Sequence, residues 1–579
     1  RWNQEPEADA GSKEFDTWQP NPDKSWIVKR DGKWQAVIDP QETNKTGGDS
    51  HTYLDGDKVG SVVNGTVGRN LIQEPSKLTL TDNWTAADYI FDADTKNIRV
   101  YEADAGTDRE SSVSDIVNTG KDVTDQFDIT VQGTKAAAKA KASYLKGLKG
   151  LKNPKQVTLL IPGTVNFADG KGAAQVRKDF GRNAGDELAF CTDPNGKSLT
   201  NSGSETVKKH SEKVNDETQL TNEPYICGYV PPAKKDVVSE ASQGGEQESV
   251  QGKVVFPGQR VEYQLDTQPQ LPSSLAYGIK SVSFTDSYDR YLKPDKQTLE
   301  MMDLNTGKPV SKKKYTTKWD DSKHMFTLTV TDQETIGQWR AGTNPRIQVR
   351  FEGTVSDDAP TDHKVNNKWV LTLNNSLTPS NEVFNIPPTL NPKKKDTQKD
   401  PTIDIDGMTA LLGDEIYYRV DIDATQTNQA YKVWRLGMTD DYDDSYLKLD
   451  ASKVEITDET GKDVTARFNI QDKDGVLYAY AKTVDTEVPA TGETVKGDPQ
   501  PTDLKAYSES DEHDPLTQPS IDQTLLGHTY TVTMPMTVIK VTDGYVVRNK
   551  ATQVLNKVRK DTNEVTNPLK PVNPSKDVA

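Results

Sequence analysis

A short block of similar residues recurs three times along the chain. Each copy begins with Asn-Glu, passes through a stretch that contains proline, and ends with Lys-Asp. The separation from Asn to Lys is nearly the same in each copy: Asn222 to Lys235, Asn381 to Lys395, and Asn563 to Lys576. A block that closes one unit and opens the next is typical of tandem modules, and its prolines keep each connection extended. The repeat therefore predicts an elongated rod of modules.

The spacing of the blocks sets the expected boundaries. Successive blocks begin at Asn222, Asn381 and Asn563, and each interval between them is long enough for one independent hydrophobic core. We expect a first module over residues 1–230, a second over 231–390 and a third over 391–570. Residues 571–579 are expected to link to a following module that Lys576-Asp577-Val578 begins, so the segment is expected to be part of a longer protein.

Composition excludes several classes of function. The net charge of −17 and the isoelectric point near 5.0 argue against nucleic acid or an anionic membrane as the main partner. No apolar run approaches the roughly 20 residues of a membrane span, so no membrane contact is expected within this segment. Two cysteines in 579 residues fit an exported protein that does not depend on a disulfide framework.

Hydrophobic alternation predicts the secondary structure. Residues 254–256, 260–265, 326–330 and 529–534 alternate apolar and polar side chains and are rich in β-branched types, which is typical of half-buried strands. Thr-Gly-Lys turns recur at 119–121, 306–308 and 460–462. The turn follows Asp286 and Asp440 at the same spacing, but it lies much farther from Asp82, which indicates an insertion in the first module. The pattern predicts an all-β chain of three divergent sandwiches.

One segment departs from this pattern. Residues 135–152 are rich in Ala, Leu and Lys, which favour helices, and Asn153-Pro154 would end a helix there. The segment predicts a short cross-over helix like one expected at 331–340. Its lysines are interpreted as a solvated face rather than as a site for an anionic ligand.

Little in the sequence indicates an enzyme. Six histidines lack metal-ligand spacing, and no serine or cysteine nucleophile signature is present. No cofactor is expected, except that an acidic run could hold calcium with help from backbone carbonyls, through Asp441, Asp443 and Asp444.

Other repeated features carry a family resemblance. Each module has an Asp before an aromatic residue, at Asp82, Asp286 and Asp440, and Asn-bearing strands at 365–368 and 547–550 align with each other. The first module opens with Pro-Asp-Lys-Ser-Trp at 22–26, followed by Asp-Gly at 31–32. With the Asp-Asp-Tyr-Asp stretch at 440–443, these modules resemble the C-terminal domains of the antigen I/II family of Gram-positive surface adhesins.

The resemblance implies a variant immunoglobulin-like β-sandwich locked by a spontaneous isopeptide bond between Lys and Asn. Burial would leave the lysine as a free amine, and a protonated Asp would polarise the Asn carboxamide that the amine attacks. The fold supplies the rate by holding both ends together. The residues expected to do this are Lys235, Asp286 and Asn367 in module two, and Lys395, Asp440 and Asn549 in module three.

The first module fits the resemblance less well. Lys24 and Asp82 stand at the matching places, but Asp216 occupies the position that aligns with Asn367, which leaves Asn215 as a poor substitute. The same module holds both cysteines, Cys191 and Cys227. In an exported protein they could close a disulfide worth about 4 kcal/mol of loop entropy. Two buried free thiols are the alternative.

The resemblance also implies a function. We expect a non-enzymatic stalk of a bacterial surface adhesin, monomeric and anchored to the cell wall through a downstream segment. It would project, or contribute to, binding of a host glycoprotein or extracellular matrix protein. The alternatives are the shaft subunit of a sortase-assembled pilus and an accessory region of a carbohydrate-active enzyme.

Overall fold

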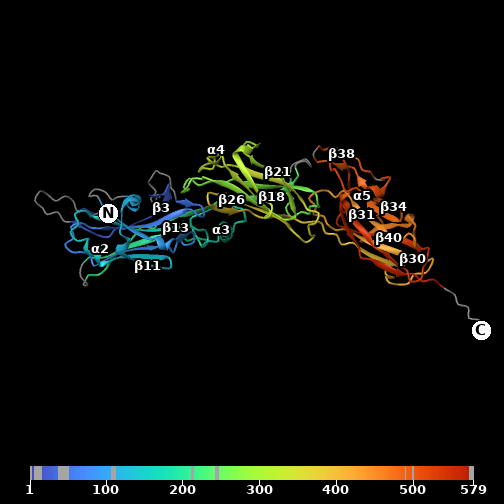
Figure 1. Cartoon of the computed structure of the whole chain (residues 1–579), viewed down its shortest axis with the longest axis horizontal. Helices are drawn as coiled ribbons and strands as arrows, with labels where there is room; N and C mark the ends of the chain where they lie inside the picture. Colours follow the sequence, from blue (N-terminus) through green and yellow to red (C-terminus); the bar gives the residue numbers. More distant parts are fainter. Residues whose placement is uncertain are drawn as a thin grey trace, which may run out of the picture.

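Three β-sandwiches follow one another along the computed structural model, which describes residues 3–4, 16–36, 51–105, 112–209, 214–240, 247–489, 491–498 and 501–572. They lie end to end and form an elongated rod (Figure 1). We call them modules one, two and three. The prediction of tandem all-β sandwiches in a rod is confirmed. Lys576, Asp577 and Val578, which are predicted to open a further module, lie outside the described residues.

Module two pairs two antiparallel sheets. The first has the order β18 (Lys234–Ser239), β19 (Arg260–Thr267), β25 (Ile347–Val355), β21 (Leu292–Asp303) and β22 (Lys308–Pro309). The second has the order β23 (Tyr315–Asp320), β24 (Met325–Val330), β20 (Val282–Tyr288), β26 (Val365–Leu373) and β27 (Ser376–Pro379), with β28 (Val383–Asn385) also on β26. The inner faces meet in one core, where Phe284 stacks on Trp369.

Module three repeats this arrangement. Its first sheet has the order β29 (Lys393–Thr397), β30 (Glu415–Ala424), β40 (His528–Val538) and β32 (Leu447–Leu449), with β33 (Glu455–Asp458) also on β40. Its second has the order β34 (Phe468–Lys473), β35 (Val476–Ala481), β31 (Leu436–Asp441), β42 (Ala551–Leu555) and β43 (Val558–Asp561). Short pairs complete it: β36 (Thr483–Val484) with β39 (Ser520–Ile521), β37 (Thr486–Glu487) with β38 (Thr494–Val495), and β41 (Val546–Asn549) with β44 (Val565–Pro568).

Module one has the same two sheets with additions. One sheet has the order β10 (Lys121–Asp122), β9 (Arg99–Asp104), β13 (Lys155–Val165), β6 (Lys58–Val67), β3 (Asp23–Arg30) and β4 (Lys33–Ala36), with β8 (Phe91–Ala93) on β13. The other has the order β11 (Phe127–Gln132), β12 (Lys135–Ala140), β7 (Lys77–Asn83), β15 (Ser202–Lys208) and β16 (Glu217–Leu220). The additions are the sheet β14 (Leu188–Phe190), β17 (Cys227–Val230) and β5 (Thr52–Tyr53), and the pair β1 (Asn3–Gln4) and β2 (Asp16–Thr17).

Alternation along the strands builds these cores. In β40 every second side chain is buried between the sheets, beginning at Tyr530 and ending at Val538. Successive side chains of a strand point to opposite faces, so this pattern leaves the intervening threonines and Pro535 on the outer face.

The described helices are short, and two of them, at 142–146 and 333–336, connect a strand of one sheet to a strand of the other. The α-helices are α1 (Val113–Thr119), α2 (Ala142–Lys146), α3 (Ala173–Asp179), α4 (Gln333–Ile336) and α5 (Leu504–Glu509). The 3-10 turns are η1 (Thr95–Asn97), η2 (Thr124–Gln126), η4 (Lys312–Lys314), η5 (Ala451–Lys453), η6 (Thr465–Arg467) and η7 (Gln523–Leu525).

The prediction of one helix over 135–152 is wrong for most of the segment, because only Ala142–Lys146 is helical. Residues 135–140 form β12, which pairs with β7 and β11, and α2 begins only at Ala142. Ala136, Ala138 and Ala140 are buried on one face of that strand. Pairing on both edges and burial of alternate alanines override the helix propensity of this segment. The helix itself follows β12 as α4 follows β24, as expected.

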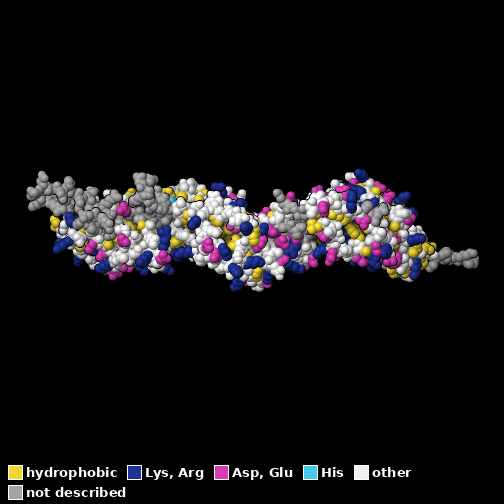
Figure 2. All heavy atoms as spheres, turned by 90° about the horizontal axis from the view of Figure 1, so that it is seen from above, with side chains coloured by type: hydrophobic (Ala, Val, Ile, Leu, Met, Phe, Trp, Pro, Cys, Tyr) yellow, Lys and Arg dark blue, Asp and Glu magenta, His cyan; other side chains and the backbone are white. Residues whose placement is uncertain are grey.

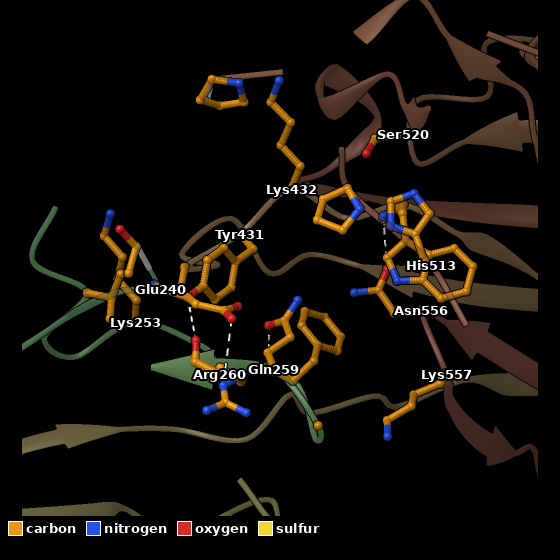
Figure 3. A pocket seen from close by; sticks show the side chains of 18 of the residues that line it. Glu240, Lys253, Gln259, Arg260, Tyr431, Lys432, His513, Ser520, Asn556 and Lys557 are labelled. Carbon is orange, nitrogen blue, oxygen red and sulfur yellow. Dashed lines mark hydrogen bonds and ion pairs between the residues drawn. The ribbon is translucent and has the colours of Figure 1, made fainter. Parts of the chain in front are cut away.

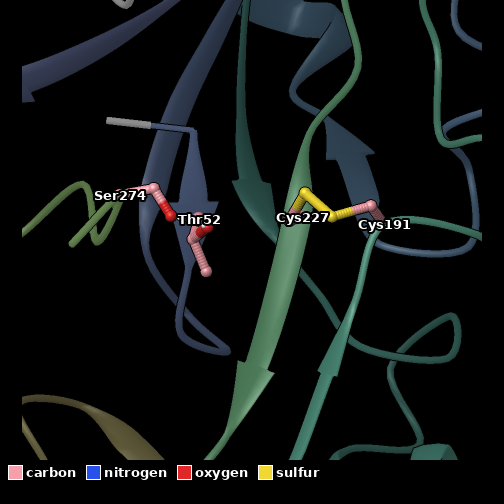
Figure 4. The surroundings of a disulfide bond; sticks show 4 residues. All are labelled: Thr52, Cys191, Cys227 and Ser274. Atoms are coloured by element: carbon pink, nitrogen blue, oxygen red, sulfur yellow. Dashed lines mark hydrogen bonds between the residues drawn. A yellow bond between two sulfur atoms is a disulfide. The ribbon is translucent and has the colours of Figure 1, made fainter. Parts of the chain in front are cut away.

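The predicted disulfide between Cys191 and Cys227 is confirmed. Cys227 begins β17, which pairs with β5 at Thr52, and the Thr52 hydroxyl lies 2.6 Å from that of Ser274 in module two (Figure 4). The disulfide therefore lies in module one, one strand away from the contact with module two.

Candidate functional site

A lysine and an aspartate meet inside module two. Lys235 is on β18 in the first sheet and Asp286 is on β20 in the second, and both side chains are fully buried. The Lys235 Nζ lies 2.5 Å from an Asp286 carboxyl oxygen. It also lies 5.0 Å from the centre of the Tyr263 ring and 5.4 Å from that of Phe351. The ion pair thus sits between the sheets, in a mainly apolar setting.

Burial shifts the pKa of both groups toward their neutral forms. Desolvation lowers the pKa of Lys235 to about 8, although Asp286 opposes this shift. Desolvation also raises the pKa of Asp286, against the effects of Lys235 and of the nearby Asn367 carboxamide. Both shifts favour the neutral forms, which are a free amine and a carboxylic acid.

Asn367 completes the group. It is 1% exposed and lies on β26, two residues before the residue that pairs with Asp286, so both side chains share the inner face. Among the described residues neither polar atom of its carboxamide has a well-formed hydrogen bond, and one Asp286 oxygen is also unpaired. Unsatisfied buried polar atoms are costly, and native structures contain few of them.

Module three holds the same three groups, but its lysine is Lys394. The Lys394 Nζ contacts Asp440 with both side chains fully buried, and it lies 5.1 Å from the centre of the Tyr418 ring. Burial lowers the pKa of Lys394 and raises that of Asp440. Lys395 is the next residue on β29, so it points to the opposite face and is exposed. The choice of Lys395 is therefore corrected to Lys394.

Asn549 takes the place of Asn367 in module three. On the strand opposite β31, Ala551 pairs with Asp440, and Asn549 lies two residues before it. Asn549 is 1% exposed, and within the described part of the chain neither polar atom of its carboxamide has a well-formed hydrogen bond. The geometry matches that of module two.

Module one also brings three such groups together, and its asparagine is Asn201. The Lys24 Nζ contacts Asp82 with both side chains fully buried, and burial lowers the pKa of Lys24. Gly203 pairs with Asp82 across β15 and β7, so Asn201, 1% exposed, lies two residues before it as in the other modules. Asn215 is exposed, in the connection between β15 and β16. The choice of Asn215 is therefore corrected to Asn201.

A serine distinguishes module one. Ser61 occupies the strand position that Tyr263 and Tyr418 hold in the other modules, two residues before the partner of the lysine. Its hydroxyl contacts the Lys24 Nζ, donates to Asp82 at 2.5 Å and accepts from the Asn201 carboxamide at 2.6 Å. A hydrogen-bonding hydroxyl thus replaces an aromatic face at the centre of this site.

The asparagines of the repeated block position the lysines. In module two the Asn381 carboxamide accepts from the Lys235 N–H at 2.8 Å and donates to its C=O at 2.8 Å. The equivalent pairs are Asn222 with Lys24 and Asn563 with Lys394. Each block therefore anchors the lysine of its own module, and the first two blocks also supply the lysine of the module that follows.

The corrected lysine also makes the repeat regular. Lys394 follows Asn381 at the same spacing at which Lys235 follows Asn222 and Lys576 follows Asn563, whereas Lys395 lies one position farther along. Equal spacing in all three copies is the sequence signal that identifies the correct lysine.

The remaining predicted site residues do not converge. Asp441 and Asp444 are exposed, and Asp443 accepts a hydrogen bond from the Tyr545 hydroxyl. Among the described residues no three acidic, histidine or cysteine side chains are arranged to hold a metal ion, so calcium there stays a prediction. Over the same residues no helix has the length and apolar character needed to span a membrane.

A separate buried carboxyl lies on β15 of module one. Glu205 is fully buried, and its oxygens accept from the Thr66 N–H at 3.2 and 3.3 Å. Burial raises the pKa of Glu205 from 4.5 to about 8, and the bond from Thr66 acts against this rise.

We expect Glu205 to make the stability of module one depend on pH. Because the folded pKa lies above the unfolded value, its contribution is fully present below pH 4.5 and is lost as the pH rises to about 8. The loss between pH 6 and 8 should be about 2 kcal/mol, and Glu205→Gln should abolish it. Urea unfolding of the whole chain, followed on module one at several pH values, measures this. Parallel pH profiles for wild type and variant would contradict it.

A hollow of about 650 Å³ lies between modules two and three. Its walls carry Glu240 and Arg260 from module two, and Tyr431 and His513 from module three (Figure 3). The Trp434 ring, the largest aromatic surface here, stacks on His513, with the Arg435 guanidinium 4.5 Å from its centre.

The fold and the site define a class of protein: tandem immunoglobulin-like sandwiches, each with a lysine, an aspartate and an asparagine buried between its sheets. The sequence profile of the cell surface antigen I/II C2 terminal domain matches residues 232–387 and again 392–569, more than half of the chain. The chain belongs to the antigen I/II C2 terminal domain family.

Solved structures give weaker likenesses. The C-terminal domain of the Streptococcus agalactiae AgI/II polypeptide BspA is 15% identical, with a TM-score of 0.42 over 58% of this chain and 100% of that one. The C-terminal domain of the Streptococcus pyogenes antigen I/II-family protein AspA is 14% identical, with a TM-score of 0.41 over 58% of this chain and 99% of that one. Comparison with curated protein sequences gives no match.

Proposed function

We propose that this region is the stalk of a cell-wall-anchored adhesin in which each of the three modules is locked by one isopeptide bond. The bonds join Lys24 to Asn201, Lys235 to Asn367, and Lys394 to Asn549. Asp82, Asp286 and Asp440 promote them. The stalk projects, or contributes to, binding of a host glycoprotein or matrix protein, and family membership supports this assignment.

One observation carries the proposal. In all three modules the Asp contacts the lysine, and the Asn lies two residues before the strand partner of that Asp. These three groups come from three different strands, except that Asn201 lies directly before β15, and all are buried. Chance placement would not repeat one register three times in modules whose sequences have diverged.

The chemistry follows from the pair. The Asp286 carboxylate takes a proton from the ammonium, and the free amine of Lys235 attacks the Asn367 carbonyl carbon. The protonated Asp286 donates to the carboxamide as charge develops on it. The bond from that carbon to the Asn nitrogen breaks, and ammonia leaves with the donated proton. The attacking nitrogen passes one proton back to the carboxylate, so Asp286 ends protonated. The reaction occurs once per module, and the fold supplies the proximity.

Intact-mass spectrometry tests this proposal. The chain should be lighter than its sequence and disulfide require by three ammonia molecules. The Asn201→Ala variant should be lighter than the mass expected from its own sequence by only two ammonia molecules, because the bond of module one cannot form. Asn215→Ala is the matched control and should still lack all three. A full unmodified mass for the wild-type chain would refute the proposal.

A further inference from the structure

The two junctions between modules are built alike. At the first, the Thr52 N–H donates to Ser274 C=O at 2.9 Å and its C=O accepts from Ala276 N–H at 2.8 Å. At the second, Val254 makes the same two bonds, to Asn428 at 2.7 Å and from Ala430 at 2.8 Å. In each case a short segment before the second strand of one module pairs in parallel with a loop of the next.

A tyrosine hydroxyl forms hydrogen bonds across each junction. The Tyr277 hydroxyl accepts from the Lys29 N–H at 2.8 Å and donates to Lys58 C=O at 2.7 Å. Tyr431 follows Ala430 as Tyr277 follows Ala276, and its hydroxyl accepts from the Glu240 N–H at 2.8 Å and donates to Arg260 C=O (Figure 3). Each hydroxyl thus joins the first two strands of the preceding module.

At each junction an apolar side chain of one module is buried in the core of the next. Leu54, two residues after Thr52, is fully buried in the core of module two. Phe256, two residues after Val254, is 1% exposed and belongs to the core of module three. Burial of such a side chain against the neighbouring core stabilises the contact.

Module three carries the same segment at its far end. Gly413 N–H donates to Val538 C=O as Gly258 does to Val355, and Leu411 N–H is capped by Asp414 as Phe256 is by Gln259. This alignment makes Thr409 the equivalent of Val254, and Leu411 that of Phe256.

This end of module three is open. Ala410 is paired on one side with Pro568 and Lys570, but among the described residues Thr409 has no backbone hydrogen bond. Leu411 is 36% exposed, Met408 56% and Leu412 63%. Figure 2 shows hydrophobic side chains gathered at this end of the rod. An open strand edge beside exposed apolar side chains is a place where another chain segment can pair.

We propose that this end of module three, residues 408–412, is a docking face for a further β-sandwich module that presents an Ala-Tyr loop. Continuity with the two existing junctions identifies the occupant: the loop would pair with Thr409, and Leu411 would enter the core of the arriving module.

A second copy of module one does not fit this description. Tyr277 and Tyr431 lie nine residues before Asp286 and Asp440, and the residue nine before Asp82 is Gln73. The preceding Ile72 is 85% exposed and replaces the alanine of the loop. Module one therefore lacks the hydroxyl that fastens a junction, so the face selects a tyrosine-bearing module rather than head-to-tail self-association.

The test extends the whole chain by one module. Residues 1–572 are followed directly by a second copy of residues 232–390, so that the new lysine follows Asn563 at the spacing at which Lys235 follows Asn222. Hydrogen exchange is then measured on peptides that cover 408–412, which occur once in this chain. The Thr409 amide should exchange at least about tenfold more slowly than in the unextended chain, approaching the protection of Val254.

Two controls decide the outcome. Tyr277→Phe in the added copy alone should remove most of the gain in protection. Peptides from module two and from the added copy have the same sequence, so a single exchange rate for these peptides shows that the added copy is folded. Unchanged exchange at 408–412 beside a folded copy would overturn the proposal. Dimerisation of the unextended chain with protection of 408–412 would also overturn it, because a second copy would then occupy the face.

Discussion

Lys394→Ala is expected to lower the melting temperature of module three by roughly 10–20 °C. The proposed bond closes the long segment between Lys394 and Asn549 into one loop. In the chain-entropy model such a cross-link contributes about 5 kcal/mol, because it restricts the unfolded chain. Calorimetry, with trypsin digestion followed on module-three peptides, measures the loss.

Lys395→Ala is the matched control for this experiment. It removes the same side chain from the adjacent, exposed position on β29 and should leave the melting temperature within about 1–2 °C of wild type. Equal effects of the two substitutions would contradict both the cross-link and the assignment of Lys394.

In module two, replacing the aspartate is expected to lower the free energy of unfolding more than replacing the asparagine. Asn367→Ala should cost about 5 kcal/mol, since it removes only the proposed bond and leaves the Lys235–Asp286 pair intact. Asp286→Ala should cost about 3–5 kcal/mol more, because it also leaves Lys235 without its partner in a buried, mainly apolar site.

Urea unfolding of the two variants, followed on module two, measures this difference. Ser287→Ala, an exposed neighbour of Asp286 on β20, serves as the control and should be nearly neutral. If Asp286→Ala and Asn367→Ala were equally stable, the ion pair would contribute nothing beyond bond formation.

Under this proposal the bonds also govern the response to force. Each bond ties the first strand of a module to a late strand, so load bypasses the residues between them. At the two junctions, backbone pairing and the hydrogen bonds of a tyrosine hydroxyl connect neighbouring modules, which keeps the rod continuous. Such a stalk would transmit shear without extension of its sandwiches.

The predictions that the structure corrects concern features that depend mainly on how distant strands pack together. Lys394 and Lys395 are chemically equal; the spacing from Asn381 favours Lys394, and the pleat of β29, held in register by Asn563, turns its side chain toward Asp440. Asn201 was missed because module one has a longer connection between β15 and β16, which breaks the spacing to the Asn222 block. Alanine and lysine at 135–140 favour a helix, yet pairing with two neighbouring strands makes them a strand.

Local patterns determined much of this protein from the sequence alone. The Asn-Glu repeat, the alternation of apolar residues and the Asp before an aromatic residue predict tandem sandwiches, and they identify the aspartates that the structure places beside buried lysines. These features depend on neighbours along one strand or on a regular spacing between modules. The choice of Asn201 as the partner of Asp82 and the repeated junction depend on register between strands distant in sequence. Side chains alternate every residue, so a shift of one residue reverses the face, and only the packed tertiary structure decides it.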